Sequence, residues 1–324
     1  MLQLNVCLET RLFDAIQDVT RCVKGDVHVL RKTMEGIVIA EDIFQTEREL
    51  ILADLDSHFD FASMAKPGEF WTKQTALRAY IEQHLEQSVA ALEAYLPSSQ
   101  VSGAKSMVVY LIPGFSKCYS PIDGVQLFGL RTAASPEETL LFLIHVYYHE
   151  ISSHFYTETS RRSVAKPNTA ELFRHWLLLL IQNEGLANYV VLDSVLDLRD
   201  RGIHFSYFTY ANFISDRDAT ARSMSLCRKI LSLIDDSNLP ALRGHILQSL
   251  KDPRFPVINL VGIYLSQTIA ATFDQPELLS VADREPQEFF RMYNETGDCL
   301  RHYLFGPNGE AGSLYGLATA LRVQ

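Results

Sequence analysis

The chain has 324 residues, of which 47% are hydrophobic and 21% are charged, and its formal net charge is −10. This composition is typical of a globular protein with a sizeable core and excludes an intrinsically disordered chain. The negative charge argues against nucleic acid or an anionic membrane as the main partner.

The sequence predicts neither a membrane-spanning helix nor an export signal. Its apolar runs fall short of the roughly 18 residues that a membrane helix requires, and no basic segment followed by an apolar stretch opens the chain. The five cysteines are odd in number, widely scattered and without a C-x-x-C pair, which indicates free thiols in a reducing compartment. We therefore expect a cytoplasmic protein.

Helical patterns dominate the first hundred residues. Apolar positions recur at three- and four-residue spacing over about residues 9–23 and 72–95, and the sequence K-P-G-E at 66–69 predicts a turn before the second of these helices. Two β-rich segments follow at 107–112 and 124–130, with prolines and glycines between them. They predict two strands of a small sheet, joined by a loop.

A central helix is predicted from its start signals. Ser135 supplies an N-cap hydroxyl, Pro136 stands at the first helical position, and Glu138 is placed to close a capping box. Residues 140–148 are apolar on nearly every side apart from His145. A helix that is apolar all round is a buried one.

A second buried helix follows a polar connection. It is predicted to be capped near Asn168 and to run to Tyr189. Beyond it the chain predicts further helices, including residues 257–273 and 286–301.

Two short segments on the two buried helices carry the chemistry. Residues 149–154 have the sequence H-E-I-S-S-H, and residues 183–187 have the sequence N-E-G-L-A. Together they supply two imidazoles and two carboxylates. This is the donor set of a catalytic zinc site, in which two His and a Glu hold the metal and a second Glu activates its water.

The spacing of the imidazoles departs from the usual zinc motif. In H-E-x-x-H the two imidazoles share one helix face at i and i+4, whereas His149 and His154 are five residues apart. A π-bulge at Ser152 and Ser153 would accommodate the extra residue between the two imidazoles. The serine hydroxyls could donate hydrogen bonds to the backbone carbonyls that lose their helical partners. His145 and His149 have the regular spacing, but no carboxylate then follows the first imidazole. We select His149 and His154, with His145 as the reserve ligand.

This arrangement resembles the gluzincin zinc peptidases, whose third ligand is a Glu on the following helix. Residues 183–187 look like their E-G-x-A segment, and residues 261–264, V-G-I-Y, are similar to a downstream element of the poorly characterised zinc-dependent peptidases of that clan. The resemblance covers roughly residues 105–275. The departure is the lengthened H-E-x-x-x-H motif, for which dipeptidyl peptidase III is a precedent among active zinc peptidases.

The resemblance implies Zn²⁺ bound by His149, His154 and Glu184. It also implies that Glu150 is the general base, which takes a proton from the metal's water and passes it to the leaving amine. A phenol or imidazole should stabilise the oxyanion, and Tyr264 is the candidate. The expected function is zinc-dependent hydrolysis of peptide bonds in a peptide or protein substrate.

Two neighbouring features have a supporting role and a plain structural alternative. Asn188, one turn after Glu184, could orient a ligand imidazole as a hydrogen-bond acceptor, or could be an ordinary polar helix residue. The strand at 124–130 could pair the substrate backbone by strand addition, or could simply belong to the sheet.

Two other functions stay open. The first is a catalytically inactive zincin-like binding module whose lengthened motif no longer binds metal. The second is a non-peptidase metalloprotein that uses His145, His149, Glu150 and Glu184.

The predicted fold class is mainly α with a small β-sheet (α+β), in which a zincin-like catalytic core lies between helical N- and C-terminal parts. The boundaries that we expect are a helical N-terminal region at residues 1–100, a metal-binding core at 101–195 and a helical C-terminal subdomain at 196–324.

Overall fold

The computed structural model describes residues 2–66, 68–96, 103–116, 118–122, 124–130, 133–153, 169–250, 256–282 and 284–305. Within these ranges the chain is mainly helical with one small sheet, which confirms the α+β class. None of the helices described there is both long and apolar enough to cross a membrane.

The contacts between residues divide the chain into two compact units, and each is described by itself. Unit 1 comprises Met1–Ala94, Gln100–Tyr147 and Gly202–Tyr207, and unit 2 comprises Tyr95–Ser99, Tyr148–Arg201 and Phe208–Gln324. The three-part division at residues 100 and 195 stays a prediction.

Unit 1 contains a four-stranded mixed sheet with the order β1-β2-β4-β3. Its strands are β1 (Leu2–Glu9), β2 (Gly103–Pro113), β3 (Cys118–Ile122) and β4 (Val125–Leu130). β1 and β4 each pair with β2 in parallel, and β3 pairs with β4 in the antiparallel sense. The two predicted strands are therefore present, but they are parallel neighbours with β3 inserted between them along the chain.

The position of β4 corrects one expectation from the sequence. β4 is hydrogen-bonded to β2 on one side and to β3 on the other. A strand that is paired on both sides has no free backbone groups for a further strand. The prediction that residues 124–130 pair a substrate backbone is therefore wrong.

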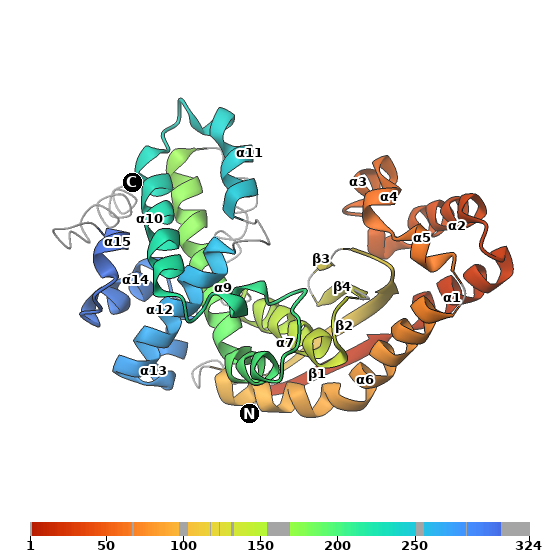
Figure 1. Cartoon of the computed structure of the whole chain (residues 1–324), viewed down its shortest axis with the longest axis horizontal. Helices are drawn as coiled ribbons and strands as arrows, with labels where there is room; N and C mark the ends of the chain where they lie inside the picture. The colour runs from red at the N-terminus through yellow and green to blue at the C-terminus, as the bar shows by residue number, and fades with distance from the viewer. Residues whose placement is uncertain are drawn as a thin grey trace. The chain divides into compact units, whose positions relative to one another are not determined.

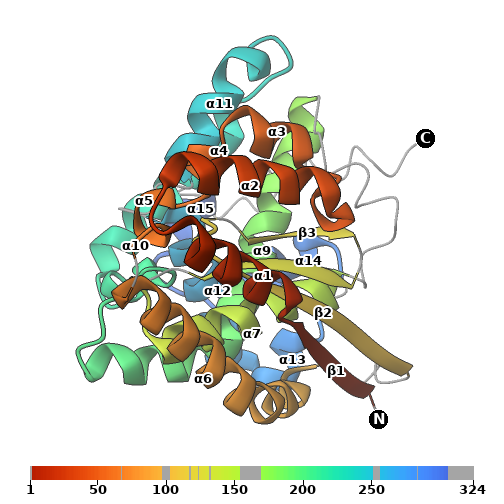
Figure 2. The same ribbon diagram turned by 90° about the vertical axis from the view of Figure 1, so that its right-hand side faces the viewer.

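Two helices of unit 1 lie along this sheet (Figures 1 and 2). α1 (Arg11–Val23) contacts β2, and α6 (Glu69–Leu92) contacts β1. The buried positions of α6 recur every three or four residues, as the amphipathic pattern requires. Trp71 of α6 meets Phe13 of α1 edge to face, with ring centroids 6.0 Å apart.

The segments between α1 and α6, and the short turn that follows α6, are also helical. They are α2 (Val27–Ala40), η1 (Asp42–Phe44), α3 (Arg48–Ala53), α4 (Leu55–His58), α5 (Phe61–Met64) and η2 (Glu93–Tyr95).

The central helix, α7 (Pro136–Ser153), begins where the sequence predicts. The Ser135 hydroxyl accepts a hydrogen bond of 3.0 Å from the backbone N–H of Glu138, which confirms the N-cap. The fully buried Glu138 carboxylate accepts bonds of 2.7 and 2.6 Å from the backbone N–H groups of Ser206 and Tyr207. Both bonds go to Oε1, and they offset part of the cost of burying this side chain.

Unit 2 is helical in the part that the structure describes. Its longest helix is α9 (Ala170–Asp200), which is capped by Thr169, one residue after the predicted cap, and runs eleven residues past Tyr189. The other elements are η4 (Thr209–Asn212), α10 (Arg217–Leu233), α11 (Leu239–Leu250), α12 (Val257–Phe273), α13 (Gln275–Leu279), α14 (Pro286–Glu295) and α15 (Arg301–Phe305). α12 has the predicted bounds, whereas the helix predicted at 286–301 is α14, which already ends at Glu295.

α9 and α12 cross in direct backbone contact at a pair of glycines. A Cβ atom added to Gly185 would lie 2.5 Å from the carbonyl oxygen of Gly262, and one added to Gly262 would overlap the carbonyl oxygen of Ile181. Only residues without a side chain allow two helices to approach so closely. The crossing places Glu184, next to Gly185, beside α12.

Candidate metal centre

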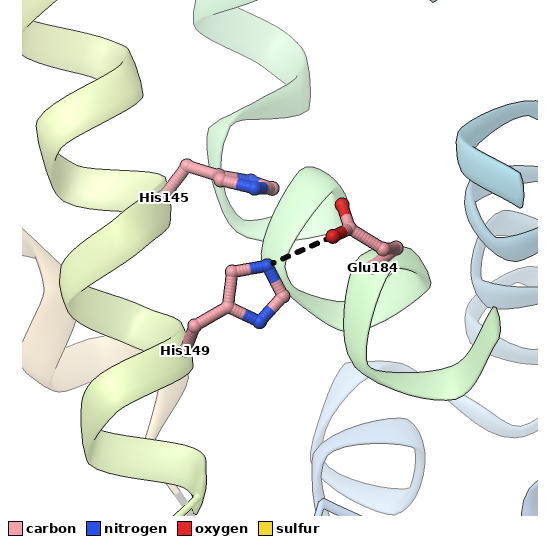
Figure 3. A group of neighbouring side chains, drawn as sticks. All are labelled: His145, His149 and Glu184. Atoms are coloured by element: carbon pink, nitrogen blue, oxygen red, sulfur yellow. Dashed lines mark ion pairs between the residues drawn. The ribbon is translucent and has the colours of Figure 1, made fainter. Parts of the chain in front are cut away.

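Three side chains from two helices converge on one point (Figure 3). α7 contributes His145 and His149, and α9 contributes Glu184. Each side chain offers one ligand atom, and these atoms all lie within 4.8 Å of one another. We call His145, His149 and Glu184 the metal group.

The geometry of α7 accounts for the two imidazoles. Residues four apart lie on the same helix face, one turn above the other, so His145 and His149 project in the same direction. His145 is 5% exposed, whereas the side chains of His149 and Glu184 are 28% and 23% exposed. The side chains of the latter two are therefore partly exposed to solvent.

The metal group fits zinc in donor type and spacing. The His149 Nε2 atom lies 3.6 Å from Glu184 Oε1. Ligand atoms at 2.0–2.1 Å from a tetrahedral zinc lie about 3.3 Å apart, and two His with one carboxylate are a usual catalytic set. Small rotations of these side chains would bring the group to that spacing.

An aromatic stack in unit 1 packs against the His145 imidazole. Phe142 lies one turn earlier on α7, and its ring is nearly parallel to the imidazole at 5.7 Å. Tyr207 stacks on Phe142 at 4.1 Å and donates a hydrogen bond of 3.2 Å to the backbone carbonyl of Gly129. These contacts restrict the orientation of the His145 ring.

Two amide side chains hold the Glu184 carboxylate. Asn259 of α12 donates a hydrogen bond of 2.9 Å to Oε2. Asn188 donates a bond of 2.7 Å to the Glu184 backbone carbonyl and lies 3.5 Å from the same Oε2. Asn188 thus contacts a predicted ligand, but its amide nitrogen faces the carboxylate of Glu184, not an imidazole.

Two predicted site residues lie partly or wholly outside the described residues. The structure describes the backbone of Glu150, which belongs to α7, but not its side chain. His154 lies wholly outside the described residues. The pairing of His149 with His154 and the role of Glu150 as base stay predictions. Of the predicted ligands, the structure brings together His149 and Glu184, and it adds the reserve ligand His145.

Tyr264 has a well-defined partner in unit 2. Its hydroxyl donates to both carboxylate oxygens of Asp298 at 3.1 Å, and Tyr293 donates to the same carboxylate at 2.6 Å. Burial, together with Asp298, raises the pKa of Tyr264 to about 12. At about 100° per residue, Tyr264 lies roughly 160° around α12 from Gly262, which contacts α9. Its role at the oxyanion stays a prediction.

Two residues near Glu184 belong to no sequence motif, so the sequence could not identify them as neighbours of the site. Asn259 is one polar residue in an apolar helix. Tyr210 is 1% exposed, and its hydroxyl has no hydrogen-bond partner within the described ranges. Burial raises the pKa of Tyr210, and the negative charge of Glu184 raises it further. Only the packing of α9, α12 and η4 brings these residues to the carboxylate.

The comparisons with known proteins connect this geometry to a family. The model of the family described as "Putative zinc dependent peptidase (DUF5700)" matches residues 41–297. The chain belongs to this family. The matched DUF5700 region contains α7, α9 and α12, and hence the whole metal group. No curated protein and no solved structure matches the chain.

Membership of the DUF5700 family identifies the cofactor. The family is described as zinc dependent, and the metal group supplies two imidazole nitrogens and a carboxylate oxygen that could bind a metal ion. Zinc is therefore the metal that both the family and the donor set indicate.

Proposed function

We propose that this chain hydrolyses peptide bonds at a zinc site built on His149 and Glu184. The observation that carries the proposal is the convergence of two imidazoles and a carboxylate on two helices of a chain from a zinc-dependent family. Three protein ligands leave a fourth position open, as a catalytic zinc site requires. Zinc bound there supplies a Lewis acid for the scissile carbonyl and an activated water.

Two residues compete for the place of the second imidazole. His145 is supported by its position in the metal group, and His154 is supported by the H-E-x-x-x-H spacing and its resemblance to the gluzincins. The two versions share His149 and Glu184. They differ in whether His145 or His154 supplies the second imidazole ligand.

Glu150 is the proposed general base in both versions. It follows His149 directly in the sequence, which is the position that the base occupies in H-E-x-x-H zinc sites. Its task is to take a proton from the attacking water and to deliver it to the leaving amine. The substrate is a peptide or protein.

Zinc content separates the two versions of the ligand set. We expect about one zinc per chain in the wild-type protein, and we expect His149→Ala and Glu184→Ala to lose most of it, because two remaining ligands hold the ion poorly. His145→Ala and His154→Ala are the comparison, measured by elemental analysis on folded protein. The variant that loses zinc identifies the second imidazole, and full zinc in Glu184→Ala would contradict the proposed site.

Glu150→Gln tests the base separately from the ligands. The amide keeps the size and polarity of the side chain but accepts no proton at neutral pH. We expect normal zinc content with peptide hydrolysis reduced by about a hundredfold or more, measured on a mixed peptide library. Zinc loss in this variant would make Glu150 a ligand and would favour a non-peptidase metal site. Zinc-loaded wild-type protein that cleaves no peptide would favour the binding-module alternative.

A further inference from the structure

The two oxygens of the Glu184 carboxylate have different surroundings. Oε1 faces the metal group and lies 3.6 Å from His149 Nε2. Oε2 faces α12 and accepts the 2.9 Å hydrogen bond from Asn259 Nδ2. One oxygen is thus held by a neighbouring helix while the other is presented toward the imidazoles.

The glycine crossing explains why the Asn259 side chain reaches the carboxylate. Asn259 lies one turn before Gly262 on α12, and Glu184 is adjacent to Gly185 on α9. Because the two backbones touch at these glycines, a side chain as short as asparagine spans the remaining distance. Had either glycine carried a Cβ atom, the helices would have to separate and this hydrogen bond would lengthen.

The chemical type of the donor is as informative as its position. A carboxylate turns easily about its last torsion, so a ligand carboxylate needs an external partner to fix its plane. A lysine or arginine in this place would fix it but would also neutralise the charge that attracts a cation. The neutral amide of Asn259 fixes the carboxylate and leaves its negative charge available.

We propose that Asn259 is a positioning residue, which holds Oε2 of Glu184 so that Oε1 is directed at the zinc. This inference rests on the proposed function, because it assigns Asn259 a role only if Glu184 binds the metal. Partners of this kind orient ligands at metal sites, and their loss typically lowers metal affinity by about 10- to 100-fold.

The test is the zinc affinity of the full-length protein, measured by competition with a chelator after the metal has been removed. Asn259→Leu keeps the branched shape and the number of heavy atoms and removes the donor, and Asn259→Ala and Asn259→Ser guard against a failure of the larger leucine to fit. We expect zinc to bind about 10- to 100-fold more weakly to each folded variant. The matched control is Gln267→Leu, which removes another half-buried amide of α12 and should leave the affinity unchanged.

A double-mutant cycle separates positioning from general support of the fold. If Asn259 acts through Glu184, Asn259→Leu should have no further effect on zinc affinity in a Glu184→Ala background. A residue that only stabilises the helix pair would weaken zinc binding by the same factor in both backgrounds. The visible spectrum of the Co²⁺-substituted protein gives a second readout, because a reoriented carboxylate changes the ligand geometry.

The outcomes distinguish this inference from the proposed function. A wild-type protein that binds no zinc overturns both. A wild-type protein that binds zinc, together with folded Asn259 variants within about twofold of its affinity, overturns the positioning role alone. An equal effect of Asn259→Leu in the presence and absence of Glu184 also overturns it.

Discussion

The polar side chains around Glu184 show how the function of a residue depends on its neighbours. Asn188 and Asn259 both donate to Glu184, and Tyr210 is a buried phenol whose pKa that carboxylate helps to raise. Tyr264, the phenol that the sequence suggested, is bound instead to Asp298. The two phenols thus have different surroundings, one influenced by the Glu184 carboxylate and the other hydrogen-bonded to Asp298.

Tyr264→Phe distinguishes a role of Tyr264 in the stability of unit 2 from a role in stabilising the oxyanion. Loss of hydrogen bonds to a charged acceptor should lower the free energy of unfolding by about 1.5–3 kcal/mol, with zinc content unchanged. Tyr293→Phe is the matched control, because it removes a bond to the same carboxylate. Urea unfolding and peptide hydrolysis are measured on both variants. A large loss of kcat in Tyr264→Phe alone would support the oxyanion role.

At the level of elements, the contact between α9 and α12 determines which residues surround the carboxylate. Neither helix has a side chain at the crossing, since Gly185 and Gly262 meet backbone to backbone. Residue 185 belongs to the N-E-G-L-A segment, which resembles the E-G-x-A segment of the gluzincins. The helix that it meets is α12.

Gly262→Ala and Gly185→Ala should each destabilise the protein. The added methyl group overlaps a backbone carbonyl that cannot move aside, and overpacking of this kind costs about 1–3 kcal/mol or more. Gly36→Ala in α2 is the control, because a Cβ atom there meets nothing within 4 Å. Without a clash, alanine in a helix stabilises by about 0.5–1 kcal/mol. Thermal unfolding of the three variants should therefore give changes of opposite sign, and a neutral Gly262→Ala would contradict the close crossing.

At the scale of the whole molecule, the described core consists mainly of apolar side chains, so we expect it to form without a metal ion. Within unit 2 the metal group has ligands on two different helices, since His149 belongs to α7 and Glu184 to α9. An ion that binds only the folded arrangement stabilises it by mass action. Zinc should therefore add stability to the fold without being required for it.

Removal of zinc should lower the melting temperature without unfolding the chain at 25 °C. At free zinc of about one hundred times the Kd, the stabilisation is about 2.7 kcal/mol. Differential scanning calorimetry with zinc and with a chelator measures the shift, and circular dichroism checks that the metal-free protein keeps its helices. His149→Ala should show no shift. A metal-free protein that is unfolded, or a shift that persists in His149→Ala, would contradict this account.

Local signals in the sequence were sufficient to predict α7, α9 and α12, the helices around the candidate site, and the types of donor residue on the first two. The N-cap of α7 at Ser135 and the bounds of α12 depend on neighbouring residues only, so they are visible in the sequence. His149 and Glu184 were identified because their residue types and spacing match a zinc donor set. β1 was missed although its apolar residues alternate over Leu2–Glu9, because the strand becomes evident through its parallel pairing with residues about a hundred positions away.

The tertiary structure alone decided which partners surround those residues. The pairing of β4 on both sides, the contact of Asn259 with Glu184 and the bond between Tyr264 and Asp298 all join segments that are distant in sequence. Such contacts depend on how helices and strands pack in three dimensions, and neither periodicity nor motif spacing records that packing. The sequence by itself therefore determined which metal-binding side chains the candidate site can offer, whereas the packing of α9 against α12 decided how its carboxylate is held.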